Sequence, residues 1–400
     1  MTENKIKIGL VANNVDILIE NFMTSEKVEF YHLNFSWKDK CFPNPHQLEC
    51  VDSADYIIID TGIAAFFQRE DLESDIEKIF SKIRSKSKNG IIGVEGADWF
   101  HFAQKPIIYK ELDVILKSGG VYRDKDQYNS YSGACSSNPL WDSTSIANPW
   151  QYENETLDKI KVSLPCFIAV DPFFRRELRK NSPRINGLDR IVRNTKERMF
   201  HVYIEQKSRQ ASVNSKYHFR GSITHLSRLQ LGEKLNDLDV EGTYKLLFTE
   251  DEYMWGSKYG RKKLHKPYKL ELKNRAKSID LIGNRIDKKK MVDEMLAHGI
   301  ILSPNGFGEL CYRHAEAWQL NRVLVCQDLS HVEMLFNIED NKNAVFCKSD
   351  FSDIEEKLLD LKNDSYRNNI ALNGKKEWEK WIANPAKILH EGFEKYLIQE

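Results

Sequence analysis

The sequence lacks any long apolar run. No stretch approaches the roughly 18 consecutive apolar residues of a membrane-spanning helix. The opening residues, MTENKIKIGLVANN, also lack the apolar core of a secretory signal peptide. We therefore expect neither a signal peptide nor a membrane span, and a cytoplasmic location.

The sequence also lacks an excess of charge of either sign. Lys plus Arg and Asp plus Glu number 59 each. A protein that binds nucleic acid through its overall charge is normally basic, so this balance argues against a general nucleic-acid-binding role. We expect no nucleic-acid partner.

Cysteine is scarce and shows no metal-binding pattern. Seven cysteines are scattered over 400 residues without a C-x-x-C pair. An odd number with this spacing indicates reduced thiols, as in the cytosol. His331 and Glu333 are close in sequence but have no companions at ligand spacing, so we predict no metal site.

The sequence does contain an alternation of apolar strands and amphipathic helices. In the first half we expect strands at 5–12, 55–62, 89–99 and near 166–170, with helices at 69–88 and 106–120. In the second half we expect strands at 200–206, 217–224, 243–249, 278–283, 300–306, 322–328 and 344–350. Helices are expected at 228–238, 287–299, from 309, at 351–363 and at 375–396.

This alternation predicts an α/β protein with two Rossmann-like, doubly wound domains that face a cleft, followed by a C-terminal helical tail. A chain of 400 residues fits two domains of about 150 to 200 residues each. We place the first domain at 1–170, a polar and basic connection at 171–197 and the second domain at 198–374. The helix at 375–400 is expected to pack back on the first domain.

Residues 302–318, LSPNGFGELCYRHAEAW, combine a strand end, two glycines and a charged helix. On a helix from 309, Glu309, Arg313 and Glu316 would lie within about 40° of one another. One interpretation is a solvated Glu–Arg pair on an outer face. The other is a nucleotide site, in which the helix N-terminus and Arg313 bind phosphate and a carboxylate accepts from ribose hydroxyls.

The longer stretch 301–328, ILSPNGFGELCYRHAEAWQLNRVLVCQD, resembles the donor-binding segment of GT-B glycosyltransferases. The resemblance is closest to bacterial group-1-like transferases with the signature SP-x-G-x-GE-x-x-x-R-x-x-EA. That signature is matched by Ser303, Pro304, Gly306, Gly308, Glu309, Arg313, Glu316 and Ala317. Many retaining members space their two glutamates one residue wider than Glu309 and Glu316, so the stereochemical outcome stays open.

The resemblance implies an activity and a setting. The protein would move a sugar from a nucleotide-sugar donor to a hydroxyl of a glycan or lipid-linked acceptor, without a metal or a resident cofactor. The nucleotide sugar would be the co-substrate. The setting would be bacterial surface polysaccharide or lipopolysaccharide synthesis, with peripheral contact at the cytoplasmic face of the inner membrane. Asn305, Gly306, Gly308, Glu309, Arg313 and Glu316 would bind the donor.

A second candidate motif lies at the first strand–helix turn of the second half. It is FRGSITHLSR, with Arg220, Gly221, Thr224, His225 and Arg228. Glycine permits close backbone approach, and threonine and arginine suit phosphate oxygens. The turn resembles the GT-x-T-H-x-x-R turn that faces the donor phosphates in the same relatives. The alternative is an N-cap threonine with surface basic residues.

A basic segment lies between Lys258 and Lys277 and contains nine Lys or Arg residues. It suits an anionic donor, a phospholipid-linked acceptor or an anionic membrane surface, and a solvated loop is the alternative. Within it, His265 is a catalytic candidate and Lys266 a donor-binding candidate.

Carboxylates follow two strands of the first half: Asp60 ends one strand, and Glu95 and Asp98 end another. Ligands gather at the carboxyl ends of parallel strands, so an acceptor hydroxyl could meet a base here. If the reaction retains configuration, one of these carboxylates could instead be the nucleophile. Capping roles remain an alternative for each.

Two other functions fit the same sequence features. A nucleotide-sugar epimerase on the same double fold would turn over the donor without an acceptor. A non-catalytic module that binds glycans or nucleotides would need none of the candidate carboxylates.

Overall fold

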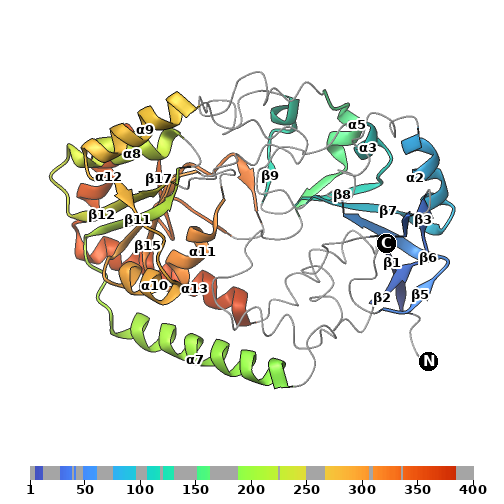
Figure 1. The fold of residues 1–400 in the computed structure, drawn as a ribbon, viewed down its shortest axis with the longest axis horizontal. Coiled ribbons are helices and arrows are strands. Elements are labelled where there is room, and N and C mark those ends of the chain that lie inside the picture. Colours follow the sequence, from blue (N-terminus) through green and yellow to red (C-terminus); the bar gives the residue numbers. More distant parts are fainter. Residues whose placement is uncertain are drawn as a thin grey trace.

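The computed structural model describes residues 5–11, 28–37, 40–41, 48–60, 75–95, 106–117, 120–129, 151–162, 188–223, 226–248, 266–305, 310–334 and 337–383. They form two parallel β-sheets, one toward each end of an elongated molecule (Figure 1). Within the described helices, no stretch combines the length and apolar character needed to cross a bilayer.

The first sheet is parallel throughout and has the order β10-β8-β7-β6-β1-β2-β5. Its strands are β1 (Ile6–Val11), β2 (Val28–Leu33), β5 (Cys50–Val51), β6 (Ala54–Asp60), β7 (Ser87–Glu95), β8 (Val114–Lys117) and β10 (Ile160–Val162). The order reverses between β1 and β6, as in a doubly wound fold. Helix α2 (Ile76–Arg84) buries Ile76, Ile79, Phe80 and Ile83 against β7, as the helical spacing predicts.

The second sheet is also parallel and has the order β13-β12-β11-β14-β15-β17. Its strands are β11 (Tyr217–Ser222), β12 (Gly242–Leu247), β13 (Ile282–Gly283), β14 (Ile300–Ser303), β15 (Val323–Gln327) and β17 (Val345–Cys347). The helices of this half are α8 (Leu226–Asn236), α9 (Lys266–Ser278), α10 (Lys288–Leu296), α11 (Tyr312–Gln319), α12 (Ile354–Asp360) and α13 (Asp364–Ala383). The strand order reverses between β11 and β14. The predicted fold class of two doubly wound α/β halves is therefore confirmed.

A short two-stranded ribbon joins the halves. Strand β9 (Val121–Tyr122) pairs antiparallel with β16 (Val332–Glu333), and lies between the two sheets in Figure 1. The backbone N–H of Arg123 donates to His331 O over 3.0 Å, and its Nε donates to Ser330 O over 3.0 Å. The rings of Tyr122 and His331 stack with centroids 6.0 Å apart. Residues far apart in sequence thus hold the two halves side by side.

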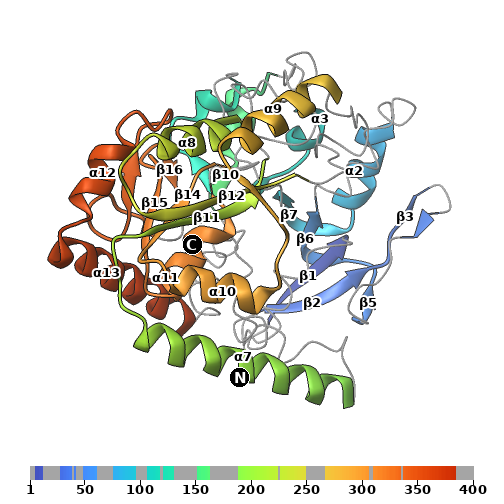
Figure 2. The same ribbon diagram turned by 60° about the vertical axis from the view of Figure 1, so that its left-hand side comes forward.

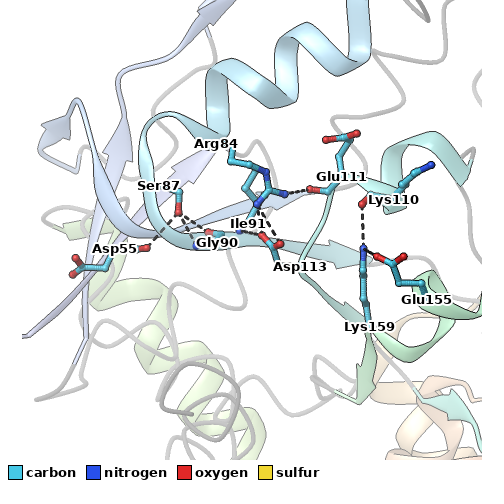
Figure 3. Close-up of polar contacts among 10 residues, drawn as sticks. All are labelled: Asp55, Arg84, Ser87, Gly90, Ile91, Lys110, Glu111, Asp113, Glu155 and Lys159. Carbon is cyan, nitrogen blue, oxygen red and sulfur yellow. Dashed lines mark hydrogen bonds and ion pairs between the residues drawn. The ribbon is translucent and has the colours of Figure 1, made fainter. Parts of the chain in front are cut away.

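The helix expected at 106–120 is wrong in its second part. Helix α3 (Pro106–Lys110) ends early, and β8 follows it. Asp113 accepts from Arg84 Nη1 over 2.9 Å and from the N–H of Ile91 over 2.7 Å, so that the start of β8 is fixed against β7 (Figure 3). This network lies at the amino ends of the strands, opposite the edge where such sheets bind ligands.

The strand expected at 200–206 is also wrong. These residues belong to α7 (Leu188–Gln210), a helix of 23 residues. The buried residues Ile204 and Ser208 lie one turn apart on the same face, which gives helical rather than alternating periodicity. Because α7 begins at Leu188, it also occupies part of the expected connection at 171–197. The domain boundaries themselves stay a prediction.

The end of the described chain packs on the second half. Helix α13 contacts α11 and β15. A Cβ on Gly374 would lie 2.4 Å from the indole of Trp318, so a side chain there would collide with it. Lys375 donates to Gln319 O over 3.0 Å. The helix expected at 375–400 lies only partly within the described residues, which end at Ala383, and its expected packing on the first domain stays a prediction.

Candidate functional site

The candidate site lies where the strand order of the second sheet reverses, at the carboxyl ends of β11 and β14. Open α/β sheets bind ligands at this point. Strand β11 supplies Arg220 and Gly221, the residues after β14 supply Asn305, and α8 and α11 supply Arg228 and Arg313. The structure thus brings together these five residues from the two predicted motifs.

Arg313 lies against strand β11. Its guanidinium sits over the ring of Phe219, with Cζ 4.6 Å from the centroid, and its Nη2 donates a short hydrogen bond to Arg220 O. Its Nε is buried and has no hydrogen-bond acceptor among the described residues. The solvated outer-face interpretation of Arg313 is therefore wrong.

Gly221 leaves room for this guanidinium. A Cβ on Gly221 would lie 2.5 Å from Arg313 Nη2 and 2.9 Å from Phe219 Cζ, closer than atoms can approach. The glycine is needed here because Arg313 crosses the strand at this position. The sequence predicted a glycine for close approach of a ligand, whereas the close approach in the structure is that of an arginine.

Arg228 ties the ends of β11 and β14 together. It is 4% exposed, and its Nε, Nη1 and Nη2 donate to the carbonyl oxygens of Asn305, Ser222 and Pro304 over 2.8, 2.7 and 3.2 Å. Tyr244 Oη donates to Arg228 O over 2.6 Å. Burial lowers the pKa of Arg228 to about 10, so it stays charged at neutral pH. All three of its nitrogen atoms thus donate to carbonyl oxygens at the end of β11 and just after β14.

Arg220 points to a different partner. It forms a two-point ion pair with Glu294 of α10, Nε to Oε2 over 2.8 Å and Nη2 to Oε1 over 3.1 Å. Its Nη1 donates to Asn284 O over 2.9 Å. The charge of Arg220 is therefore largely compensated in this structure, whereas no carboxylate pairs with Arg313 or Arg228 among the described residues.

Glu316 lies one turn after Arg313 on α11 and is half-buried. Burial raises the pKa of its carboxyl group, and the charges of Arg313 and Lys288 oppose that effect. Helix α11 begins at Tyr312 rather than at 309, with Cys311 extended before it as N-cap. Glu309 thus precedes the regular helix and lies outside the described residues.

The sequence did not single out a polar cluster at the start of α11. Cys311 Sγ lies 2.9 Å from Ser303 Oγ, which lies 3.2 Å from His314 Nδ1. Burial raises the pKa of the Cys311 thiol, but the hydrogen bond to His314 and the charges of His314, Arg313 and Arg228 lower it well below its usual range. The feature of the sequence that could have revealed this cluster is a capping pair, with Cys311 as N-cap and His314 three residues later.

Asn305 is held by a residue that the sequence reasoning missed. Its backbone N–H donates to Gln327 Oε1 over 2.8 Å, and Gln327 Nε2 donates to Ser349 O over 2.6 Å. The Oδ1 of Asn305 is buried without a hydrogen-bond donor among the described residues. A polar residue at the end of the apolar strand β15 was the only sign of this contact.

Among the carboxylates of the first half that could activate an acceptor, the structure describes one side chain, that of Glu95. Glu95 ends β7, is 2% exposed and accepts a short hydrogen bond from Tyr109 Oη. Lys117 of β8 is its register partner and is fully buried. Glu95 is therefore enclosed by its own half rather than presented to solvent.

Several predicted site residues lie outside the described residues. They are Asp98, Thr224, His225, His265, Gly306, Gly308 and Glu309, together with the side chains of Asp60 and Lys266. Their roles stay predictions. Within the described ranges, no three His, Cys, Asp or Glu side chains gather closely enough to hold a metal ion.

Comparison with known proteins gives distant likenesses only. No family model and no curated protein sequence matches the chain. Among solved structures, Anabaena HepE in complex with UDP-glucose is 10% identical, with 97% of this chain and 99% of that chain covered and a TM-score of 0.44. A Rickettsia africae glycosyltransferase is 10% identical (98% and 99% covered, TM-score 0.45). The sucrose-phosphate synthase of Thermosynechococcus elongatus is 9% identical (97% and 98% covered, TM-score 0.48).

Proposed function

We propose that the protein is a metal-independent glycosyltransferase of GT-B architecture. It would move a sugar from a nucleotide-sugar donor to a hydroxyl of a glycan or lipid-linked acceptor. The observation that carries this proposal is the position of Arg313, a half-buried cation without a carboxylate partner among the described residues, at the reversal point of the second sheet. Its unpaired Nε and the N-terminus of α11 suit an anionic ligand.

Glycosyl transfer from such a donor requires stabilisation of the leaving nucleoside diphosphate. Negative charge develops on its phosphate oxygens as the glycosidic bond breaks, and a fixed cation with a helix dipole stabilises that charge. We assign this role to Arg313. Because Arg228 is engaged by three carbonyl oxygens, we assign it to positioning of the two phosphate-facing loops. Arg220, paired with Glu294, holds β11 against α10.

The acceptor would bind at the carboxyl edge of the first sheet. Because Glu95 is enclosed and hydrogen-bonded to Tyr109, we assign it a positioning role and keep Asp98 and Asp60 as candidates for the base. If configuration is retained, one of these carboxylates would act as nucleophile instead. The lipid-linked acceptor, the setting in bacterial surface polysaccharide synthesis and the cytoplasmic location follow from the sequence resemblance.

A donor-turnover assay tests this function. Wild-type protein would be incubated with UDP-, GDP-, dTDP-, ADP- and CMP-sugars, with and without glycan acceptors, and the release of free nucleotide would be measured. We expect one donor class to be turned over, faster with acceptor, and about a hundredfold slower turnover in Arg313→Ala. Arg275→Ala, which removes a partly exposed ion pair with Glu233, is the matched control and should behave as wild type.

The same assay separates the alternatives. An epimerase would convert the nucleotide sugar into an isomer without releasing free nucleotide, which chromatography of the donor would detect. A binding module would leave every donor intact. Either result would contradict the proposed reaction.

A further inference from the structure

The start of helix α11 carries a cysteine to which the proposed function gives no role. Helix α11 contacts β14 and β15 and lies beside the second sheet in both views (Figures 1 and 2). Cys311 is its N-cap, with an extended backbone directly before the first helical residue. Cys326 and Cys347 are buried in strands β15 and β17, whereas Cys311 is partly exposed. Among the described cysteines of this half, Cys311 is therefore the one open to a small reagent.

A serine and a histidine contact this cysteine. Cys311 Sγ lies 2.9 Å from Ser303 Oγ, which lies 3.2 Å from His314 Nδ1. His314 Nδ1 also accepts from the backbone N–H of Cys311 over 3.2 Å. Ser303 and His314 are both buried. The Ser303 hydroxyl is placed to donate to the sulfur, and such a hydrogen bond favours the ionised thiolate over the thiol.

The positive charge around Cys311 acts in the same direction. Burial raises the pKa of the Cys311 thiol, but the hydrogen bond to His314 and the charges of His314, Arg313 and Arg228 lower it well below its usual range. The N-terminus of α11 also favours negative charge at this position. Burial instead raises the pKa of Cys326 and of Cys347. Because the thiolate is the nucleophilic form of cysteine, Cys311 alone among these three combines exposure with ionisation.

A further observation points to a negatively charged group beside this cluster. The Nε of Arg313 is buried and has no hydrogen-bond acceptor among the described residues. Arg313 follows Cys311 by two residues, so an anion at this nitrogen atom and a thiolate at Cys311 would belong to one positively charged region. The surroundings of Cys311 therefore suit anionic sulfur.

We propose that Cys311 is a modification site for hydroperoxides at the edge of the candidate donor site. The ionised sulfur attacks one oxygen of the hydroperoxide, so that an S–O bond forms and the O–O bond breaks. The sulfur loses two electrons and becomes a sulfenic acid. With hydrogen peroxide, the hydroxide that leaves takes up the proton released by the thiol and becomes water.

Oxidation of Cys311 should disturb the position of Arg313. Ser303 is fully buried 2.9 Å from the sulfur, so an added oxygen atom must displace one of the two side chains. Because Cys311 begins α11, its displacement moves the helix start that carries Arg313. This consequence rests on the proposed function and deepens it, since it names a regulation of the donor site. The reactivity of the sulfur does not depend on that function.

Labelling of the sulfenic acid tests the modification site. The full-length reduced protein would be treated with hydrogen peroxide at about pH 6, where an ordinary thiol is almost fully protonated, and trapped with dimedone for peptide mass spectrometry. Cys50 is the matched control, because it is exposed and its Sγ also lies near a histidine, 3.9 Å from His32 Nδ1, but on strand β5. We expect Cys311 to be labelled at least about tenfold faster than Cys50. Equal labelling rates would overturn the proposal.

Nucleotide stabilisation tests the effect of oxidation. Cys311→Ser keeps a residue suited to the N-cap and removes the sulfur. We expect peroxide to weaken nucleotide binding by at least about tenfold in the wild type and in Cys50→Ser, but not in Cys311→Ser. Dithiothreitol should restore the wild type, because it reduces the sulfenic acid to the thiol, releases water and becomes a disulfide.

The outcomes separate the two proposals. An equal loss of nucleotide binding in peroxide-treated Cys311→Ser would contradict the effect on the donor site. A wild type that binds no nucleotide before oxidation sinks only the proposed function, because the labelling rates support or overturn the modification site by themselves.

Discussion

At the scale of single residues, the fit between Gly221 and Arg313 determines the shape of the candidate site. The guanidinium lies where a Cβ on residue 221 would be, on top of Phe219. The side chain of Arg313 therefore fits against the backbone of Gly221, and a single methyl group on residue 221 would collide with it.

Gly221→Ala should displace Arg313 while the fold survives. The nearest colliding atom, Arg313 Nη2, is the far end of a flexible side chain, whereas Phe219 Cζ at 2.9 Å belongs to a buried ring, so we expect a loss of about 1 to 3 kcal/mol in the free energy of unfolding. Nucleotide affinity should fall by at least about tenfold, because the cation leaves its position. Urea unfolding and nucleotide titration measure the two effects. Unchanged affinity in a folded Gly221→Ala protein would contradict the assigned role of Arg313.

His218 gives a second prediction at this scale. It is 1% exposed, and neither ring nitrogen has a partner among the described residues. Burial, followed by the nearby His298, Arg313 and Arg220, lowers its pKa from 6.5 to about 3. A histidine that stays neutral when folded and takes up a proton when unfolded stabilises the fold above pH 6.5, and this stability is lost as the pH falls toward 3.

As the pH falls from 6.5 toward 3, the free energy of unfolding should decrease by about 1.4 kcal/mol per pH unit. Between pH 6.5 and 5 the wild type should therefore lose about 2 kcal/mol through this group alone. In His218→Phe this part of the pH dependence should be absent. Urea unfolding at several pH values measures the difference, and equal slopes for the two proteins would show that His218 does not titrate as described.

At the scale of elements, Arg322 fixes the ends of helices. It is fully buried, and its guanidinium donates to Leu296 O over 2.9 Å and to Asn321 O over 3.3 Å, with Ala211 O at 3.5 Å. These carbonyls lie at or just beyond the C-termini of α10, α11 and α7, where the helix dipoles favour a cation. Burial lowers the pKa of Arg322 to about 10, so the cation persists at neutral pH.

Arg322→Met keeps most of the volume and removes the donors. Because several buried carbonyl groups lose a charged partner, we expect a loss of about 3 kcal/mol in the free energy of unfolding. Arg275→Met, on the partly exposed pair with Glu233, should cost less than about 1 kcal/mol. Equal effects in urea unfolding would mean that the helix ends do not depend on this arginine.

The elements also show where sequence reasoning succeeds and where it fails. Strands such as β6 and β14 are continuous apolar runs buried on both faces, and the sequence alone reveals them. Strand β8 is only four residues long and follows a short helix. Its extended form is determined by its pairing with β7 and β10. In α7, the run FHVYIEQ suits a strand in isolation, but its contacts with α10 favour a helix.

The candidate site was predictable to a similar extent. The two motifs predicted that Gly221, Arg228, Asn305 and Arg313 lie at one end of the second sheet, and the structure places them there because the carboxyl ends of its strands meet at that edge. The partners of these residues were not predictable. Glu294 beside Arg220 and Gln327 beside Asn305 come from other elements, and their approach depends on tertiary packing.

At the scale of the whole molecule, two doubly wound halves are joined by the β9–β16 ribbon. The ribbon joins the first half to the segment that directly follows β15, the strand of Gln327. We expect closure of the two halves on bound donor to proceed around this connection. We therefore expect the donor to bind at the second sheet, beside Arg313.

Thermal stabilisation by nucleotides tests that claim most directly. The melting temperature would be measured with UDP, GDP, dTDP, ADP and CMP for the wild type, Arg313→Ala and the control Arg275→Ala. We expect one nucleotide to raise the melting temperature of the wild type and the control but not of Arg313→Ala. Stabilisation of Arg313→Ala equal to that of the wild type, or no stabilisation by any nucleotide, would contradict a donor site at this helix.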